Sequence, residues 1–381
     1  MRVFLASRIY SPEPAAAAFR LRALARALAA DGHSVTVLTT RTPSGDAGPA
    51  DPSVDVRRAP VLRDATGYVR GYVQYMSFDI PLLFRLLFAN RPDVIVAEPP
   101  PTTGFVVRLV SALRRVPFVY YAADIWSDAA ESTGAPGWVV AVVRRLEAGS
   151  LKRASRVIAV SDGVAERVRQ LAPTATIEVV TNGVDTTTFT PDGTRLADAP
   201  LAVYAGTTSE WQGADVFIRS MPTVLEQIPE ARLVFVGQGS AWQSLRELAR
   251  RLDLDAVEFR DVVPPEEAAV LLRSARVALV SLQPGQGYDF AVPTKIFAAA
   301  ACGTPVLFAG TGAAADLISA AGIGSAPGYD DHRVGLELLS MLRVPVPDAR
   351  RTEIQQWAER NVSAAATARK AAAVVLSAVA T

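Results

Sequence analysis

Residues 288–307 read YDFAVPTKIFAAAACGTPVL, and they decide the local structure around a single lysine. Pro293 suits the start of a helix and Gly303 suits the position just past its end, so a short helix is expected between them. The apolar residues after Gly303 predict a buried strand. A helix N-terminus attracts anions, and Lys295 would add a full positive charge beside it. The stretch therefore favours a phosphate site at Lys295, although a solvated lysine on a loop fits the same pattern.

Length and composition predict a soluble protein with two domains. The chain has 381 residues, of which 50% are hydrophobic and 20% are charged. A globular chain of this length is expected to contain two hydrophobic cores. The formal net charge of +1 provides no basic field, which excludes nucleic acid as a main partner. One cysteine and two histidines exclude internal disulfides and the usual zinc sites, so we expect no metal.

The sequence predicts a cytosolic protein, and one segment leaves membrane contact open. Residues 1–6 look like a first strand and lack the features of a secretory signal. The apolar run 78–88 is interrupted by Arg85 and is about half as long as a membrane span. Residues 68–88 combine aromatic and apolar side chains with nearby arginines. An interfacial helix and a helix of the domain core both fit this pattern.

Strand-like runs alternate with helical patterns along the chain, which predicts parallel sheets covered by helices on both faces. The first series of strands is expected at 3–6, 35–39, 94–97, 118–122, 156–160 and 177–180. The second series is expected at 201–205, 233–236, 257–259, 277–280 and 305–308. We therefore predict one Rossmann-like domain over 1–190, a second over 200–360, and a C-terminal helix within 361–381 that returns to the first domain.

Ligands of open α/β sheets bind beyond the carboxyl ends of the strands, so the turns at those ends are the candidate sites. In the second half these turns are 206–209, 237–240, 261–264 and 283–290. The glycines of 206 and 237–239 allow close approach of a ligand, but the third glycine of a dinucleotide fingerprint is missing. A plain strand-to-helix turn fits equally well.

The corresponding turns of the first half are 10–18, 98–103 and 124–128. Asp124 follows an apolar strand and should lie at the rim of the site, where a carboxylate can bind sugar hydroxyls. Asp is also a good helix N-cap, so a purely structural role for Asp124 fits the same position.

Short motifs follow one another in a fixed order over nearly the whole chain. They are YSPEP (10–14) followed by Arg20 and Leu24, GHSVTVLT (32–39), RPDV (91–94), DIW (124–126), VIAVS (157–161), NGVD (182–185), YAG (204–206), QG (212–213), VGQG (236–239), PTKIF (293–297) and GTPV (303–306). Each motif alone is unspecific. Together they resemble the retaining GT-B glycosyltransferases of family 4, especially the bacterial polysaccharide and natural-product branch.

The resemblance implies an α/β GT-B fold, in which two Rossmann-like domains with parallel sheets face each other across a cleft. It implies transfer of a sugar from a nucleotide-sugar to a small-molecule or lipid-linked acceptor with retention of configuration. The nucleotide-sugar, linked to UDP or dTDP, would be a co-substrate, and no bound cofactor or metal is expected. The donor would bind the C-terminal domain and the acceptor the N-terminal domain.

The resemblance also assigns residues. Thr294 and Lys295 would hold the diphosphate, and the Val263 backbone would hold the base. The other expected donor-binding residues are Gly206, Thr207, Gly237, Asp289 and Phe290. The expected acceptor-side residues are Glu13, Ala15, Ala16 and Trp126, and alanines occupy 15 and 16 where the family usually has glycine. Asp124 and Lys295 are the expected catalytic residues.

Besides residues 15 and 16, the chain departs from the family at four donor-side positions. Phe290 and Ala298 replace two family glutamates, one facing the donor sugar and one the ribose. Thr207 and Gln212 replace a family arginine and lysine. Asp289 is the expected substitute for the sugar contact. Because a lost carboxylate suggests a ligand without the matching hydroxyl, a dTDP-linked donor is a hypothesis.

Two other functions remain open at this stage. The lost glutamates and the lost Arg/Lys pair also fit a catalytically silent homologue that acts as a partner or activator of another transferase. A nucleotide-sugar epimerase would share the two-domain architecture. Epimerisation needs acid and base groups around the sugar ring, and the turns at the carboxyl ends of the predicted strands offer few.

Overall fold

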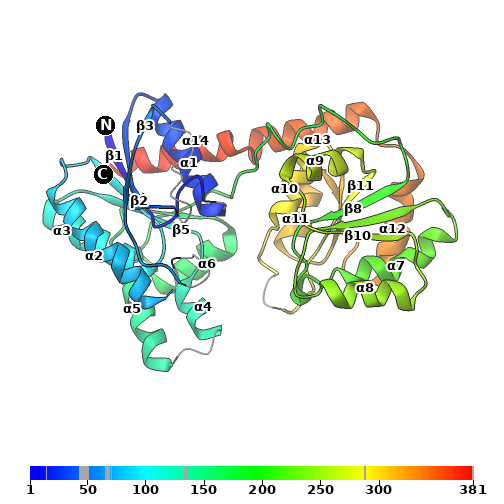
Figure 1. Cartoon of the computed structure of the whole chain (residues 1–381), viewed down its shortest axis with the longest axis horizontal. Coiled ribbons are helices and arrows are strands. Elements are labelled where there is room, and N and C mark those ends of the chain that lie inside the picture. The colour runs from blue at the N-terminus through cyan, green and yellow to red at the C-terminus, as the bar shows by residue number, and fades with distance from the viewer. Residues whose placement is uncertain are drawn as a thin grey trace. The chain divides into compact units, whose positions relative to one another are not determined.

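The computed structural model describes residues 1–13, 15–42, 51–64, 69, 71–132, 136–286 and 289–379. The chain forms two compact units (Figure 1). The first contains Met1–Asn182 and the residues from Thr367 onward, and the second contains Gly183–Ala366. The sequence predicts limits at 190, 200 and 361, whereas the structure divides the chain at Asn182 and returns it to the first unit at Thr367.

The first unit is built on a parallel seven-stranded sheet with strand order β3-β2-β1-β4-β5-β6-β7. Its strands are β1 (Arg2–Ala6), β2 (Ser34–Thr40), β3 (Val54–Ala59), β4 (Val94–Ala97), β5 (Phe118–Ala122), β6 (Arg156–Ala159) and β7 (Ile177–Val179). Its helices are α1 (Ala16–Ala30), α2 (Tyr72–Phe88), α3 (Pro101–Arg114), α4 (Trp126–Ser132), α5 (Gly137–Arg153), α6 (Asp162–Leu171) and α14 (Ala364–Ser377).

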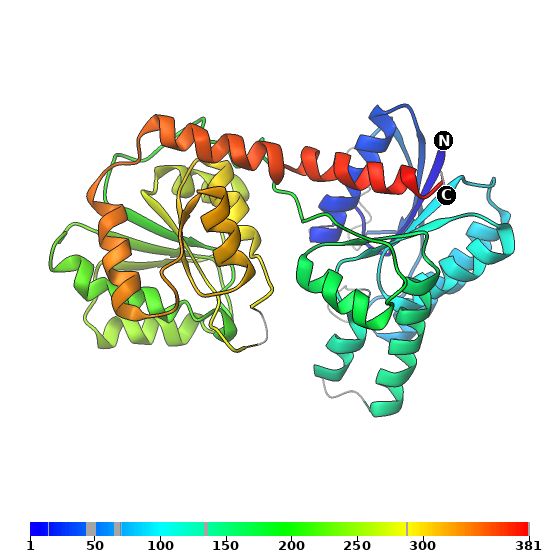
Figure 2. The same ribbon diagram turned by 180° about the vertical axis from the view of Figure 1, so that it is seen from behind.

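Alternation along β1 assigns the helices to the two faces of this sheet. Val3 and Leu5 belong to a buried cluster with residues of α1 and α14. Phe4 and Ala6 point to the opposite face and pack with residues of α2, α3 and α5. Successive side chains of a strand point to opposite faces, so a run of buried residues predicts a sheet covered on both sides. The C-terminal part of α14 lies beside the N-terminus of the chain (Figure 2).

The second unit repeats this design with a parallel six-stranded sheet of order β10-β9-β8-β11-β12-β13. Its strands are β8 (Leu201–Ala205), β9 (Arg232–Val236), β10 (Val257–Arg260), β11 (Val277–Ser281), β12 (Val306–Ala309) and β13 (Gly324–Ser325). Its helices are η1 (Glu210–Gln212), α7 (Asp215–Leu225), α8 (Trp242–Arg251), α9 (Pro265–Ser274), α10 (Thr294–Ala301), α11 (Ala313–Ala321), α12 (Asp331–Arg343) and α13 (Asp348–Asn361).

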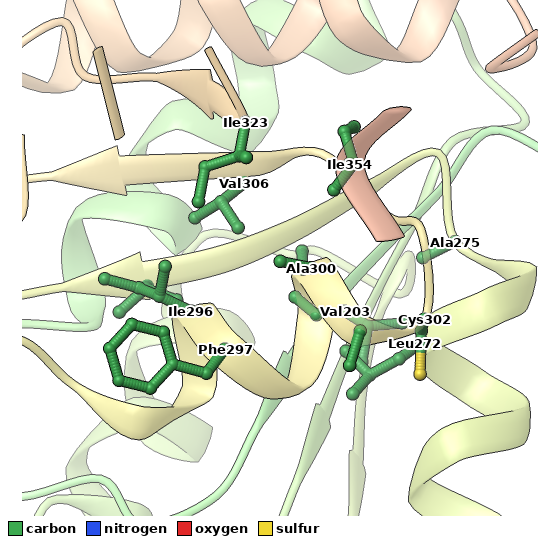
Figure 3. Packing of buried hydrophobic residues seen from close by; sticks show 14 of the residues in the cluster. Val203, Leu272, Ala275, Ile296, Phe297, Ala300, Cys302, Val306, Ile323 and Ile354 are labelled. Carbon is green, nitrogen blue, oxygen red and sulfur yellow. The ribbon is translucent and has the colours of Figure 1, made fainter. Parts of the chain in front are cut away.

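Packing fixes the position of α10 in the second unit. Ile296, Phe297 and Ala300 of this helix point into a cluster that also contains Val203 of β8 and Ile354 of α13 (Figure 3). All five side chains are 2% exposed or less. The buried face of α10 therefore anchors the helix, and its first turn is held beside the carboxyl ends of the strands.

Two parts of the fold are not among the expected elements. The edge strand β3 reads VDVRRA, and its three charged residues hide the alternation that marks a half-buried strand. Helices α11, α12 and α13 fill most of 313–361, a region without a sequence assignment. No helix in the described part of the chain is long and apolar enough to cross a membrane.

Candidate functional site

Lys295 lies in the first turn of α10 and reaches the carboxyl end of β8. Its Nζ donates hydrogen bonds to the Tyr204 hydroxyl at 2.7 Å and to the Thr207 carbonyl at 2.5 Å. Nζ also lies 4.0 Å from the centroid of the Tyr204 ring. Because β8 has β9 on one side and β11 on the other, this is the point where the strand order reverses. Ligands of open α/β sheets bind at such a point.

The electrostatics of Lys295 suit an anionic ligand. Burial lowers the pKa of Lys295 from its ordinary value of 10.5 to about 7. The aromatic face and the two oxygen acceptors favour the ammonium form. No ion pair joins Lys295 to a carboxylate anywhere in the described ranges. The site therefore holds a desolvated amine whose charge an incoming anion would stabilise.

Two glycines bring the backbone close together beside Lys295. Gly206 has a φ of 126°, and a Cβ there would lie 2.9 Å from Cε of Lys295. Gly237 has a φ of 139°, and a Cβ there would lie 2.3 Å from the Gly206 carbonyl oxygen. Larger residues are excluded at both positions, so the ends of β8 and β9 present bare backbone next to the lysine.

The N-terminus of α10 faces the same region. Pro293 is the N-cap residue, and no side chain in the described part of the chain caps this helix. The N–H groups of the first turn have no partner within a helix. Thr294 and Lys295 carry such groups, and Thr294 is exposed. Pro293 contributes none because it lacks an N–H, as the sequence indicates.

Gln212 has a structural role at the position where the family resemblance implies a lysine. Its Oε1 accepts a hydrogen bond from the backbone N–H of Ser209 at 2.9 Å, which closes the start of η1. The Tyr204 hydroxyl lies 3.4 Å from the same oxygen. Lys295, which bonds to Tyr204, thus supplies a positive charge beside Gln212 from another element.

Asp289 is held within its own loop. Its Oδ2 accepts a hydrogen bond from the Gly285 N–H at 3.4 Å, and its carbonyl accepts one from the Ala313 N–H at 3.1 Å. Phe290 is 47% exposed. Tyr288, the residue before them, lies outside the described residues. Within the described part of the chain, no hydrogen bond or ion pair joins Asp289 or Phe290 to Lys295.

Two further donor-side positions lie on the rim of the second core. Val263 is half-buried in the loop between β10 and α9 and packs against the apolar cluster that holds α10. Ala298 packs against the same cluster. Its methyl group offers no hydrogen bond where the family resemblance implies a carboxylate.

The acceptor-side loop of the first unit is held by an ion pair. Glu13 lies 3.3 Å from the Arg63 guanidinium, and both side chains are less than 15% exposed. Ala15 is the N-cap residue of α1, and its side chain makes no capping hydrogen bond. Ala16 begins the helix. Pro14 lies outside the described residues. Glu13 therefore already has a cationic partner.

Asp124 is exposed and follows β5, while a different carboxylate caps the next helix. Glu147 of α5 accepts hydrogen bonds from the backbone N–H groups of Trp126 at 2.8 Å and Ser127 at 3.0 Å. The alternative interpretation of Asp124 as the N-cap is therefore wrong. Burial raises the pKa of Glu147, and the hydrogen bonds it accepts oppose this shift. Asp124 itself remains available at the edge of the sheet.

The structure also shows a buried ion pair that the sequence analysis missed. Glu98, directly after β4, pairs with Arg20 of α1 and accepts a hydrogen bond from the Ser7 hydroxyl at 3.0 Å. Arg20 also donates to Asn182 at 2.7 Å. The two charged side chains are 8% and 5% exposed. The sequence does contain a signal for this residue: Glu98 directly follows the predicted strand 94–97, where site residues are expected.

Trp126 forms an aromatic cluster with a second residue missed from the sequence. Its ring meets the ring of Tyr75 from α2 edge-on, with centroids 5.6 Å apart. The Arg8 guanidinium, two residues beyond β1, lies over both rings. The carboxyl edge of the first sheet thus carries long charged and aromatic side chains. No group of potential metal ligands occurs among the residues that the structure describes.

Comparisons with known proteins match both units. Residues 16–183 match the glycosyl transferase 4-like domain, and residues 199–332 match glycosyl transferases group 1. A curated relative is the GDP-mannose-dependent alpha-(1-6)-phosphatidylinositol monomannoside mannosyltransferase of Mycolicibacterium smegmatis, 29% identical over 158 residues. The D-inositol 3-phosphate glycosyltransferase of Nocardiopsis dassonvillei is 31% identical over 179 residues. These alignments cover 38% and 42% of this chain and 41% of each relative.

A solved structure matches the complete chain. The sucrose-phosphate synthase of Thermosynechococcus elongatus superposes with a TM-score of 0.73 and 19% identity, covering 100% of this chain and 99% of that one. The two parallel sheets, each with its site at the carboxyl edge, define the GT-B class of proteins. Within that class, the chain belongs to the glycosyltransferases of family 4. The expectations of fold and family from the sequence are confirmed.

Proposed function

We propose that this protein is a metal-independent glycosyltransferase that binds a nucleotide-sugar on its second unit and an acceptor on its first, and transfers the sugar with retention. The observation that carries the proposal is the Lys295 site. A buried amine that pairs with no carboxylate of the described residues, bare glycine backbone and an open helix N-terminus all meet at the switch point of the second sheet. Each of these features favours a diphosphate.

In the proposed reaction, the acceptor oxygen forms a bond to the anomeric carbon while the bond from that carbon to the diphosphate oxygen breaks. The acceptor's proton passes to the departing diphosphate, and attack from the same face retains the configuration. Lys295 and the amides of the first turn of α10 would stabilise the charge on the leaving group. Preorganised donors of this kind supply catalysis without a metal.

The donor is proposed to be a nucleotide-sugar linked to UDP or dTDP. Ala298 offers no acceptor for a ribose hydroxyl, which supports the deoxyribose of dTDP. Asp289 is the nearest carboxylate to the position of the lost glutamate at Phe290 and is proposed to contact the donor sugar. The Mycolicibacterium relative uses GDP-mannose by its name, so GDP belongs in the test.

A lipid-linked acceptor and peripheral membrane contact are also proposed. Tyr72, Met76, Ile80, Phe84 and Phe88 follow one another at four-residue spacing on α2, and each is 37–84% exposed. They form one apolar stripe on the outer face of the helix. The named relative that acts on phosphatidylinositol monomannoside points to the same acceptor class.

Charge indicates that this stripe faces anionic lipid rather than a second copy of the chain. The single acidic residue of α2, Asp79, is 1% exposed, and the neighbouring α3 has no acidic residue. Arg85, Arg108 and Arg114 lie on the same two helices. Two copies would bring like charges together, whereas anionic headgroups would neutralise them.

The membrane proposal is tested by vesicle flotation of the full-length protein. Phosphatidylglycerol vesicles should bind it and phosphatidylcholine vesicles should not. Phe84→Gln should weaken binding about tenfold, because a phenylalanine contributes roughly 1.5–3 kcal/mol on burial. Leu336→Gln on α12 is the matched control, since Leu336 is 49% exposed and Phe84 is 52% exposed. Equal loss in both variants would contradict the proposal.

The catalytic proposal is tested by measuring the melting temperature with UDP, GDP, dTDP and ADP, because a ligand of the native state stabilises it by mass action. One nucleotide should raise the melting temperature clearly, and Lys295→Met should remove that shift. The product formed from the corresponding nucleotide-sugar should keep the anomeric configuration of the donor. A chain that binds none of the four would instead support the silent homologue.

A further inference from the structure

Arg8 is a largely buried cation of the first unit, and no carboxylate among the described residues forms an ion pair with it. Its guanidinium lies 5.1 Å from the ring centroid of Tyr75 and 5.4 Å from that of Trp126. Nη1 donates a hydrogen bond to the Val69 carbonyl at 2.6 Å. Nε is buried and has no hydrogen-bond partner. A guanidinium has five N–H donors, so most of the donor capacity of Arg8 is unused.

Each carboxylate around Arg8 already accepts from another group, although Oδ2 of Asp79 is buried without a hydrogen-bond partner. Glu98, Asp79 and Glu13 are near enough to raise the pKa of Arg8, although burial lowers it more strongly. Glu98 pairs with Arg20, and Glu13 pairs with Arg63. Asp79 accepts a hydrogen bond from the Thr103 hydroxyl at 2.6 Å.

The contrast with Arg20 shows what is missing at Arg8. Both arginines lie over aromatic rings, Arg20 at 4.8 Å from the ring centroid of Tyr121. Arg20 also has the Glu98 carboxylate and the Asn182 amide oxygen as acceptors. Arg8 has a single carbonyl acceptor. An arginine held by two rings but lacking a carboxylate is arranged to receive an anion.

The location of Arg8 connects this anion with the acceptor. Arg8 lies two residues beyond the end of β1, and Trp126 begins α4, the helix that follows β5. These strands flank β4, so both residues are at the carboxyl edge of the sheet, where ligands bind. Tyr75 belongs to α2, the helix that also carries the exposed apolar stripe.

We propose that Arg8, held against the rings of Tyr75 and Trp126, binds the phosphate group of a phosphorylated acceptor. This inference rests on the proposed function, since it takes the first unit as the acceptor side. A phosphate accepts two parallel N–H bonds from a guanidinium, and the rings hold the guanidinium plane in place. A lipid phosphate and a soluble phosphate ester present the same group to Arg8.

The test observes the Arg8 Nε–H group directly by NMR of the full-length protein with ¹⁵N-labelled arginine. Arg8→Lys identifies the signal. Inorganic phosphate should shift it saturably, and sodium chloride at equal ionic strength should not. Arg8→Lys should weaken phosphate binding about tenfold or more, because a charge-assisted hydrogen bond is lost. Arg169→Gln, on the surface of α6, is the control and should leave the binding unchanged.

Two further arms separate the possible outcomes. Dihexanoyl phosphatidic acid that binds more tightly than inorganic phosphate supports a lipid source, and equal affinity supports a soluble phosphate ester. Lys295→Met should abolish nucleotide binding and leave the Arg8 shift intact, so failure of the donor site and failure of the Arg8 site are distinguishable. An Arg8 signal that phosphate does not move, or that acetate moves with equal affinity, would overturn the inference.

Discussion

The two units share a strand order and differ in the residues that they place at the carboxyl ends of the strands. The edge of the second unit is almost bare, with Gly206 and Gly237 at the strand ends and no described carboxylate paired with Lys295. The edge of the first unit is crowded with long side chains, including the buried pair of Arg20 and Glu98. Bare backbone suits a constant group such as a diphosphate, whereas side chains shape a surface for one particular acceptor.

The largest expected effect comes from breaking the buried ion pair of Arg20 and Glu98 in the first unit. Glu98→Gln leaves Arg20 buried without its counter-charge, and it should lower the free energy of unfolding by about 3–5 kcal/mol. Urea unfolding measures this loss. Glu166→Gln removes the partner of Arg169 from an exposed pair and should cost less than about 1 kcal/mol. Similar losses in both variants would remove the distinction between a buried and an exposed ion pair.

The second largest effect is expected from replacing Lys295 in the second unit. This change should lower activity and not stability. Lys295→Met should lower kcat about 10²–10³-fold, as removal of one preorganised donor does in other enzymes. The free energy of unfolding should stay the same or rise, because a desolvated amine is replaced by an apolar side chain. Steady-state kinetics and urea unfolding of one preparation test both parts. A strong loss of stability at unchanged kcat would make Lys295 a structural residue.

A smaller effect is expected from filling the gap at Gly206. Gly206→Ala places a Cβ 2.9 Å from Cε of Lys295 and should lower kcat/KM about tenfold by displacing the amine. Gly322→Ala is the matched control, because Gly322 also has a positive φ but has open space around its Cβ position. Both variants should lose about 1 kcal/mol or somewhat more in stability. Only Gly206→Ala should lose activity, and equal kinetics would contradict the geometry.

The smallest expected effect is a dependence on pH that only the second unit should show. Burial lowers the pKa of Lys295 to about 7, and a bound diphosphate should raise it. At pH 8 nucleotide binding should therefore take up close to one proton per site. Calorimetry in two buffers of different ionisation enthalpy measures this number. Equal binding enthalpies in the two buffers would show that Lys295 does not change its charge.

The same shift makes the stability of the fold depend on pH, with a slope of the same sign as that of a paired acid. The unfolded chain holds the Lys295 proton up to pH values near 10.5, whereas the folded chain releases it near 7. The unfolded state thus binds more protons between these values, and the free energy of unfolding should increase with pH across this range. Lys295→Met should flatten that part of the curve.

Much of the fold was predictable because it depends on local patterns. The βα alternation, the helix between Pro293 and Gly303 and the two series of strands all follow from periodicity and from proline and glycine positions. The strand β3 was not predicted, because it is an edge strand whose charged residues hide the alternation of apolar side chains. The place of Lys295 in the first turn of a helix was predictable, since Pro293 and Gly303 mark the ends of that helix.

The partners of these residues were not predictable from spacing. The pairing of Arg20 with Glu98 joins residues 78 positions apart, and the contact of Lys295 with Tyr204 joins residues 91 positions apart. Glu147 took the helix-cap role considered for Asp124, because α5 packs beside the start of α4. Such contacts depend on which elements become neighbours when the core is buried.

The sequence by itself determined that this protein has two parallel α/β sheets and that a short helix begins beside Lys295 in its second half. Local propensities and short motifs carry that information within a few residues. Only the tertiary structure decided that Lys295 has no carboxylate partner among the described residues, and that Arg8 lies over two rings while Glu98 and Glu13 pair with other arginines. The charge state and the free donors of a buried side chain depend on every group packed around it, and packing alone brings those groups together.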